Sequence, residues 1–123
     1  MRIRPERVAQ MMRREIAEIL ERELRDPRIT AMVSVTDVEV TQDLSFAKVF
    51  VSLMGSPEAQ RTSLDGLTRA AGFVRKELGP RLGLREVPEI RFMHDTSLSR
   101  GARVEDLLKR IKDGETVEDE DLG

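Results

Sequence analysis

The sequence predicts an α+β fold in which helices cover one face of a three-stranded sheet. Apolar side chains recur every three or four residues near the N-terminus and again after residue 56, as in amphipathic helices. Between and after these segments lie short runs rich in β-branched residues with alternating polarity, as in strands. The resulting order is helix, strand, strand, helix, strand and a last short helix, which is typical of a single α+β domain.

The first helix is expected from about Pro5 to Leu24. Proline suits the first helical turn because its backbone N–H would lack a helical partner there in any case. One apolar face follows at helical spacing, formed by Val8, Met12, Ile16, Ile19 and Leu24. Asp26-Pro27 ends the helix, since the residue before proline is pushed out of the helical region.

Two strands joined as a hairpin should follow. In the first, from Met32 to Thr41, the valines change phase midway, which predicts a β-bulge near Thr36 and Asp37. A short polar turn leads to the second strand, whose two faces are Ala47, Val49, Val51 and Leu53, and Phe46, Lys48, Phe50 and Ser52. The second face could stack RNA bases. Packing in or beside the core is the commoner role of strand aromatics and is preferred here.

Ser56 is expected to cap a second helix that begins at Pro57. Its apolar stripe runs through Leu64, Leu67, Ala71, Val74 and Leu78 and should end at Gly79-Pro80, with residues 81–84 prolonging the segment. A third short strand should begin at Ile90 and end near His94. A last helix is expected over residues 102–112. The domain would then span residues 1–112, followed by an acidic, disordered tail over residues 113–123.

The distribution of charge favours an anionic partner more than the net charge of −2 does. The tail holds six acids and no base, which leaves 21 Lys and Arg against 17 Asp and Glu in the body. Arg outnumbers Lys 17 to 4, and guanidinium groups suit phosphate contacts. GC-rich coding would give the same bias, so both explanations stay open. The tail could also compete with RNA for the cations of the body.

Several function classes are disfavoured. Without cysteine there is neither a disulfide nor a thiolate metal site, which fits a reducing cytoplasm. His94-Asp95 could suggest a catalytic pair, but the chain has no second histidine, nucleophile motif or phosphate-binding glycine loop. Asp95 and Ser97 are expected to cap a turn. No signal peptide or membrane span is visible. We expect a soluble monomer that is not an enzyme and uses no cofactor, metal, small-molecule substrate or membrane.

Short motifs along the chain resemble the bacterial ribosome-binding factor A family in their order and spacing. The resemblance covers about residues 4–111. The matching fragments are Arg7-Val8, Glu15-Ile16, Asp26-Pro27-Arg28, Val38-Glu39, Asp43-Leu44, Ala47-Lys48-Val49, Gly72-Phe73-Val74-Arg75, Pro88-Glu89-Ile90, Asp95-x-Ser97 and Gly101.

This resemblance implies a type II KH-like topology (α-β-β-α-kink-α-β). In the family an Ala-x-Gly kink stands where KH domains carry a Gly-x-x-Gly loop, and Ala70-Ala71-Gly72 occupies that place here. It also implies binding to the free or immature 30S small ribosomal subunit, support for processing of the 5′ end of 16S ribosomal RNA, and a role in cold adaptation. A generic KH-like module for single-stranded nucleic acid and a protein-interaction domain that uses the first helix are the alternatives.

The candidate RNA-binding residues lie at and after the kink. By the resemblance, Ala70 and Gly72 are the alanine and the glycine that form the Ala-x-Gly kink. The adjoining cations are candidates for phosphate contacts: Arg69, Arg75, Lys76, Arg81 and Arg85. They could instead form a solvated helix face with acids such as Glu77. Because neither Arg75 nor Lys76 lies on the apolar stripe, reversing both charges is expected to weaken binding without lowering thermal stability.

Overall fold

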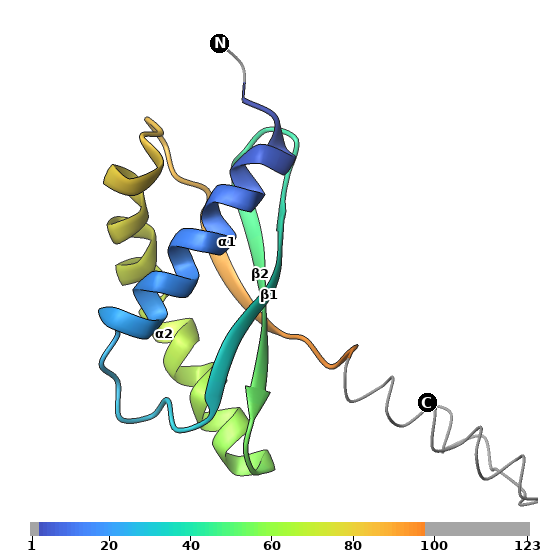
Figure 1. Ribbon diagram of the computed structural model, residues 1–123, viewed down its shortest axis with the longest axis vertical. Helices are drawn as coiled ribbons and strands as arrows, with labels where there is room; N and C mark the ends of the chain where they lie inside the picture. Colours follow the sequence, from blue (N-terminus) through green and yellow to red (C-terminus); the bar gives the residue numbers. More distant parts are fainter. Residues whose placement is uncertain (1–2, 98–123) are drawn as a thin grey trace, which may run out of the picture.

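Two helices pack on one face of a three-stranded sheet (Figure 1). The computed structural model describes residues 3–97 of the chain. The predicted α+β class, element order and one-sided helix layer are confirmed. The predicted C-terminal helix and the acidic tail lie outside the described residues. The elements are α1 (Pro5–Arg22), β1 (Met32–Val40), β2 (Phe46–Met54), α2 (Pro57–Leu82) and β3 (Glu89–His94).

The sheet has the order β1-β2-β3, with β1 antiparallel and β3 parallel to the central strand. The register shifts between Val35 and Asp37, which confirms the predicted bulge. The extra residue restores the pattern of alternation, so that Val33 and Val35 before the bulge and Val38 after it all pack with the core. Four buried side chains of β2 continue this apolar face: Ala47, Val49, Val51 and Leu53.

Both helices bury one stripe against this face, with α1 over β1 and α2 over β3. Four residues of α1 are fully buried, and they are Val8, Met12, Ile16 and Ile19. From α2 the buried apolar residues are Leu67, Ala70, Val74, Leu78 and Leu82. Each fully buried aliphatic side chain contributes about 1.5–3 kcal/mol of transfer free energy, so this shared core fixes the helix positions.

The segment between α1 and β1 is tied to the first half of α2. Ser63 is fully buried, and its Oγ accepts hydrogen bonds from the backbone N–H groups of Thr30 (3.1 Å) and Ala31 (2.9 Å). One turn later, Gly66 faces Ile29, whose Cγ1 would lie 2.8 Å from a Cβ built on this glycine. A side chain at position 66 would therefore displace the segment.

Helix α2 continues past Gly79-Pro80 to Leu82, so the expected prolongation over residues 81–84 is helical for its first two residues. Ser56 caps it as predicted, because its Oγ accepts from the N–H of Ala59 at 3.1 Å. The expected end of the apolar stripe at Gly79-Pro80 is wrong, because Leu82 is also buried and keeps the helix on the core. Pro80 removes one helical hydrogen bond, the one that a residue with an N–H would donate to the Lys76 carbonyl. The helix ends at Gly83, which has φ +65° and whose N–H bonds to the Gly79 carbonyl.

The kink expected at Ala70-Ala71-Gly72 lies inside this continuous helix. Figure 1 shows α2 changing direction about midway, while the helical assignment runs unbroken from Pro57 to Leu82. The kink is therefore a bend within one helix, and the two halves of α2 can face different parts of the molecule.

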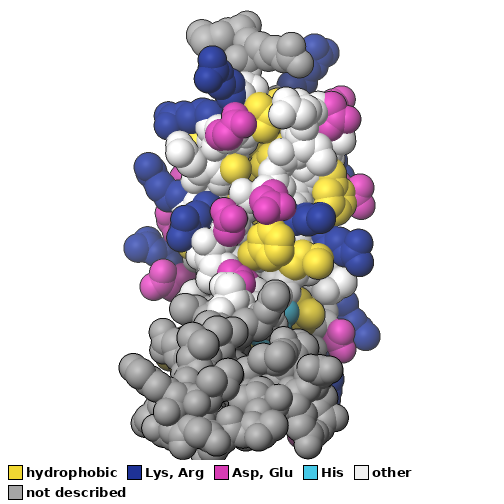
Figure 2. Space-filling model, turned by 90° about the vertical axis from the view of Figure 1, so that its right-hand side faces the viewer, with side chains coloured by type: hydrophobic (Ala, Val, Ile, Leu, Met, Phe, Trp, Pro, Cys, Tyr) yellow, Lys and Arg dark blue, Asp and Glu magenta, His cyan; other side chains and the backbone are white. Residues whose placement is uncertain are grey.

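The opposite face of the sheet carries no helix, and Phe46 and Phe50 lie on it. Both are half-buried, and neither belongs to the core cluster or to the side chains packed against it, so the preferred role of packing in or beside the core is wrong. Their strand neighbours Ala47, Val49 and Val51 point the other way into the core. Figure 2 shows apolar side chains on this face among acidic and basic ones. Within residues 3–97, no helix is apolar enough over a sufficient length to cross a membrane.

Candidate nucleic-acid interface

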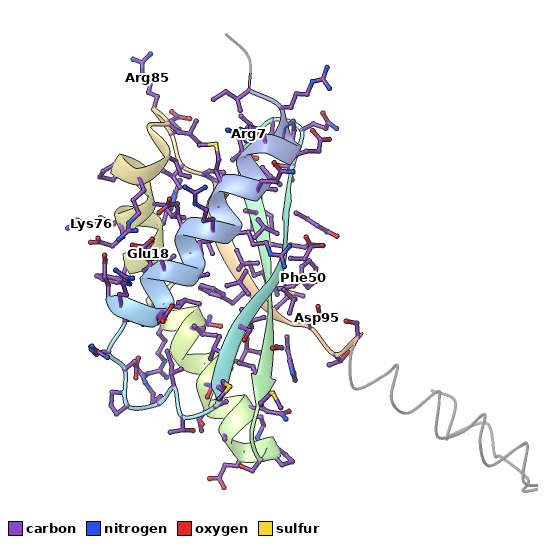
Figure 3. All side chains as sticks on the ribbon, in the orientation of Figure 1. Arg7, Glu18, Phe50, Lys76, Arg85 and Asp95 are labelled. Atoms are coloured by element: carbon purple, nitrogen blue, oxygen red, sulfur yellow. The ribbon has the colours of Figure 1, made fainter. Side chains whose placement is uncertain are left out.

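An open hollow of about 950 Å³ lies beside the second half of α2. One wall is α2 itself, another is the turn between β1 and β2, and the third is the segment between α2 and β3. Figure 3 shows Lys76 projecting from α2 and Arg85 projecting from the loop beyond its end. The lining residues are Asp43, Leu44, Ser45, Gly72, Arg75, Lys76, Gly79, Leu84, Arg85, Glu86 and Val87.

Four of the seven candidate residues line this hollow, namely Gly72, Arg75, Lys76 and Arg85. All four are exposed. Three cations thus face two lining acids, Asp43 and Glu86, so the hollow carries a positive balance. A surface of this kind attracts an anionic chain electrostatically.

Gly72 leaves open space at the bend. A Cβ built on it would meet nothing within 4 Å, so the packing of the protein itself does not require a glycine there. The helix gives up stability at this position, because glycine is about 1 kcal/mol less favourable than alanine inside a helix. Space that the protein leaves unfilled beside three cations is available to the backbone of a partner.

Arg75 is held in place by the wall of the hollow. Its Nε and Nη2 donate to the Val87 carbonyl at 3.1 and 2.8 Å. A glutamate could not donate to that carbonyl, so we now expect charge reversal at position 75 to lower stability as well as binding. The remaining N–H groups of the fixed guanidinium are still donors for an anion.

Arg81 lies in a network of ion pairs between the two helices. It pairs with Glu15 at 3.1 Å, with Glu18 at 3.5 Å and with Glu23. Hydrogen bonding to Glu15, together with the charges of Glu23 and Glu18, raises the pKa of its guanidinium. The charge of Arg81 is thus compensated within the fold, and its main role is to hold the end of α2 on α1.

Arg69 and Ala70 also lie outside the hollow. Arg69 is exposed, and its charge helps to lower the pKa of Asp26, although hydrogen bonds from Arg28 are the larger cause. Ala70 is 9% exposed and faces the core. Helical neighbours diverge by about 100° per residue, so spacing could have placed Ala70 on the side opposite Gly72. Spacing could not separate Arg69, which lies three positions before Gly72 and shares its side of the helix.

Sequence reasoning missed the contribution of the β1–β2 turn. Asp43 Oδ1 accepts from Thr41 Oγ1 (2.8 Å), from Ser45 N (3.1 Å) and from Ser45 Oγ (2.7 Å). These bonds, led by the Ser45 hydroxyl, lower the pKa of Asp43 to about 2. They also hold Leu44 at a φ of 62°, an uncommon value for a residue with a side chain. The pattern Thr-x-Asp-x-Ser was a detectable signal for such a turn.

The sequence matches known proteins over most of its length. A family model described as "Ribosome-binding factor A" matches residues 4–108. A protein named ribosome-binding factor A from Acetivibrio thermocellus is 50% identical over 105 residues, which are 85% of each chain. The chain belongs to the ribosome-binding factor A family.

Solved structures of ribosome-binding factor A share the fold. The crystal structure from Thermus thermophilus superposes with a TM-score of 0.64 and 24% identity, over 73% of this chain and 93% of that one. A homology model of the Thermus thermophilus factor, fitted into the cryo-EM map of a complex of the 30S subunit with that factor, has a TM-score of 0.59. It is 26% identical and covers 72% of this chain and 91% of that one.

The predicted kink residues lie near the middle of α2, where Ala70 is buried and Gly72 is exposed. Asp95 and Ser97 cap a turn as predicted: Asp95 Oδ1 accepts from Ser97 N at 2.9 Å. Its Oδ2 also accepts from Thr36 Oγ1 at the bulge, at 2.6 Å. The Thr36 hydroxyl is the first cause that lowers the pKa of Asp95 to about 2.

Other chemistry has little support in this region. Across the part of the chain that the structure describes, no three His, Cys, Asp or Glu side chains gather as metal ligands. The hollow is open and bounded by long charged side chains. An anion held at its surface therefore fits it better than an enclosed small molecule does.

Proposed function

We propose that this protein binds the small ribosomal subunit and contacts its RNA through the hollow beside the second half of α2. Membership of the ribosome-binding factor A family supports the partner. So does the Thermus thermophilus relative, which was fitted into a map of its complex with the 30S subunit. The observation that carries the proposed site is that three exposed cations line the same hollow as Gly72. Gly72 is also exposed, and a Cβ built on it would meet nothing within 4 Å.

The arrangement suits an RNA backbone for physical reasons. Lys76 and Arg85 supply charge, and Arg75 supplies a guanidinium already fixed by the Val87 carbonyl, so less side-chain entropy is lost on binding. Gly72 allows the sugar–phosphate chain to approach the helix closely. Asp43 stays ionised because its pKa is about 2, and it repels phosphate from the turn side of the hollow. A strand would therefore lie along the α2 side.

The biological role follows from the partner. We propose that binding to free or immature 30S subunits supports maturation of the 5′ end of 16S ribosomal RNA, above all in the cold. The protein would act without catalysis or a cofactor, as a monomer in the cytoplasm. Residues 1–112 would form the RNA-binding domain and residues 113–123 an acidic extension. The support for these finer points is the family resemblance together with the absence of a catalytic motif from the sequence.

Fractionation of cell extract on a sucrose gradient tests the partner. The protein should migrate with free small subunits, not with complete ribosomes. Cells that lack it should accumulate small-subunit RNA with an unprocessed 5′ end, more strongly at low temperature. If the protein stays at the top of a low-salt gradient, the proposed partner is wrong. If it migrates with subunits but the RNA ends are normal, only the role in maturation is wrong.

A second candidate function is the binding of single-stranded nucleic acid without need for a ribosome. It is favoured by Phe46, Lys48 and Phe50 on the helix-free face, where half-buried rings could stack bases. Such a module should bind short RNA strands as tightly as subunits, and Phe50→Ala should weaken that binding. The main proposal predicts that subunits bind far more tightly than short strands and that Phe50→Ala changes subunit binding little.

A further inference from the structure

A second basic groove lies on the other side of the end of α2. Its volume is about 490 Å³, and it runs between the first half of α1 and the last turn of α2. Arg7, Gln10 and Arg14 line it from α1, while Arg81 and Leu82 line it from α2. Residues 7 and 14 are two turns apart, about 10 Å along the axis, and share one face of α1.

In this groove the acidic side chain is paired with an arginine, whereas two other arginines make no ion pair with any residue that the structure describes. Glu15 is its one lining acid, and it is paired with Arg81 at 3.1 Å. Arg7 and Arg14 are exposed and make no ion pair within residues 3–97. Two guanidinium groups with free donors therefore face the groove. Glu18 of α1 and Glu23 just beyond its end also pair with Arg81.

The groove and the hollow flank the same turn of helix. Gly79 lines the hollow, whereas Arg81 and Leu82 line the groove. Figure 3 shows Arg7 and Arg85 at the same end of the molecule. The ion pairs of Arg81 and the burial of Leu82 both hold this turn in place, so the spacing of the two surfaces is set by the fold.

We propose that the groove between α1 and the end of α2 is a second RNA-backbone site, with Arg7 and Arg14 as its phosphate contacts. This inference rests on the proposed function. The protein then holds two separate backbone segments, one on each side of the last turn of α2. Linked contacts of this kind favour a folded RNA that presents both segments at the right spacing, since the second contact is intramolecular once the first has formed. A short single strand can occupy only one of the two sites.

The test compares two double variants with equal change in charge. Arg7→Glu with Arg14→Glu alters the groove. Arg13→Glu with Arg61→Glu alters two exposed arginines that line neither surface and serves as the control. Affinity is measured for purified 30S subunits between about 50 and 200 mM salt, and for a short single-stranded RNA of mixed sequence. Thermal unfolding checks that both variants are folded. If the groove variant is not folded, Arg7→Gln with Arg14→Gln takes its place.

The groove variant should lose at least about tenfold in affinity for subunits at the lower salt, and the slope of log affinity against log salt should fall by about two. Its affinity for the short strand should match that of the control. Equal binding of subunits by groove variant and control would overturn the second site. If Lys76→Glu with Arg85→Glu still abolishes subunit binding in that case, the proposed function survives. If the unaltered protein fails to bind subunits, the proposed function itself fails.

Discussion

Two glycines of α2 lie in opposite surroundings: one packs against the segment between α1 and β1, and the other leaves open space beside exposed cations. A Cβ on Gly66 would lie 2.8 Å from Ile29, so the α1–β1 segment fills its space. A Cβ on Gly72 would meet nothing within 4 Å. The first half of α2 also buries Ser63, whereas the second half exposes Arg75 and Lys76. Glycine is needed for packing at position 66 and leaves open space at position 72, where we propose that RNA lies.

The largest expected effect comes from the same substitution at both glycines. Gly66→Leu should lower the free energy of unfolding by about 3 kcal/mol, because the side chain would overlap Ile29. Gly72→Leu should leave stability unchanged or raise it by up to about 1 kcal/mol through helix propensity, and should weaken subunit binding. Urea unfolding and subunit binding measure the two effects. Equal stability loss at both positions would remove the contrast.

A smaller loss is expected at Ser63. Ser63→Ala leaves the N–H groups of Thr30 and Ala31 without their acceptor at a fully buried site, which should cost about 2 kcal/mol. Thr68→Ala is the matched control in the same helix, since its exposed hydroxyl bonds only to the Leu64 carbonyl and its loss should change stability by less than about 0.5 kcal/mol. Similar urea midpoints for the two variants would contradict the anchoring role of Ser63.

The acid dependence of stability should report on two aspartates that fix loop structure, Asp43 beside the hollow and Asp95 beside the bulge. Both have folded-state pKa values of about 2, below the ordinary value of about 3.9. The unfolded chain therefore binds more protons between these values, so their stabilising contribution is complete above about pH 4 and is lost as the pH falls toward 2. The urea concentration at the midpoint of unfolding should rise less steeply with pH, between pH 2 and 5, for the double variant Asp43→Ala with Asp95→Ala than for the unaltered protein. An unchanged slope would contradict the assignment.

The smallest effect is expected from the acidic tail. If its six acids compete for the cations of the second half of α2, ending the chain after Lys112 should raise affinity for a non-specific RNA a few-fold at low salt. Removing the tail should give no such gain in RNA affinity when the chain also carries Lys76→Glu with Arg85→Glu. Equal affinity of the full and shortened chains, measured by fluorescence anisotropy, would end this hypothesis.

Local patterns predicted the elements well, because caps, breakers and periodicity act over a few residues. Ser56 and the valine phase change near Asp37 are examples. The errors concern contacts between distant residues. The ion pair of Arg81 with Glu15 spans 66 positions, and the bond of Arg75 to Val87 depends on how the loop returns to the sheet. Sequence position grouped all five cations at or after the expected kink, but only the tertiary fold shows which of them face the hollow.

The central claim is that the hollow beside the second half of α2 binds the RNA of the small subunit. The most direct measurement is the affinity of Lys76→Glu with Arg85→Glu for purified 30S subunits across the salt range, beside the Arg13→Glu with Arg61→Glu control. Both altered cations line the hollow, and Arg75 keeps its bond to Val87. We predict unchanged thermal stability, at least about tenfold weaker binding at low salt and a salt slope lower by about two. Binding as tight as that of the control, with the same salt slope, would contradict the claim.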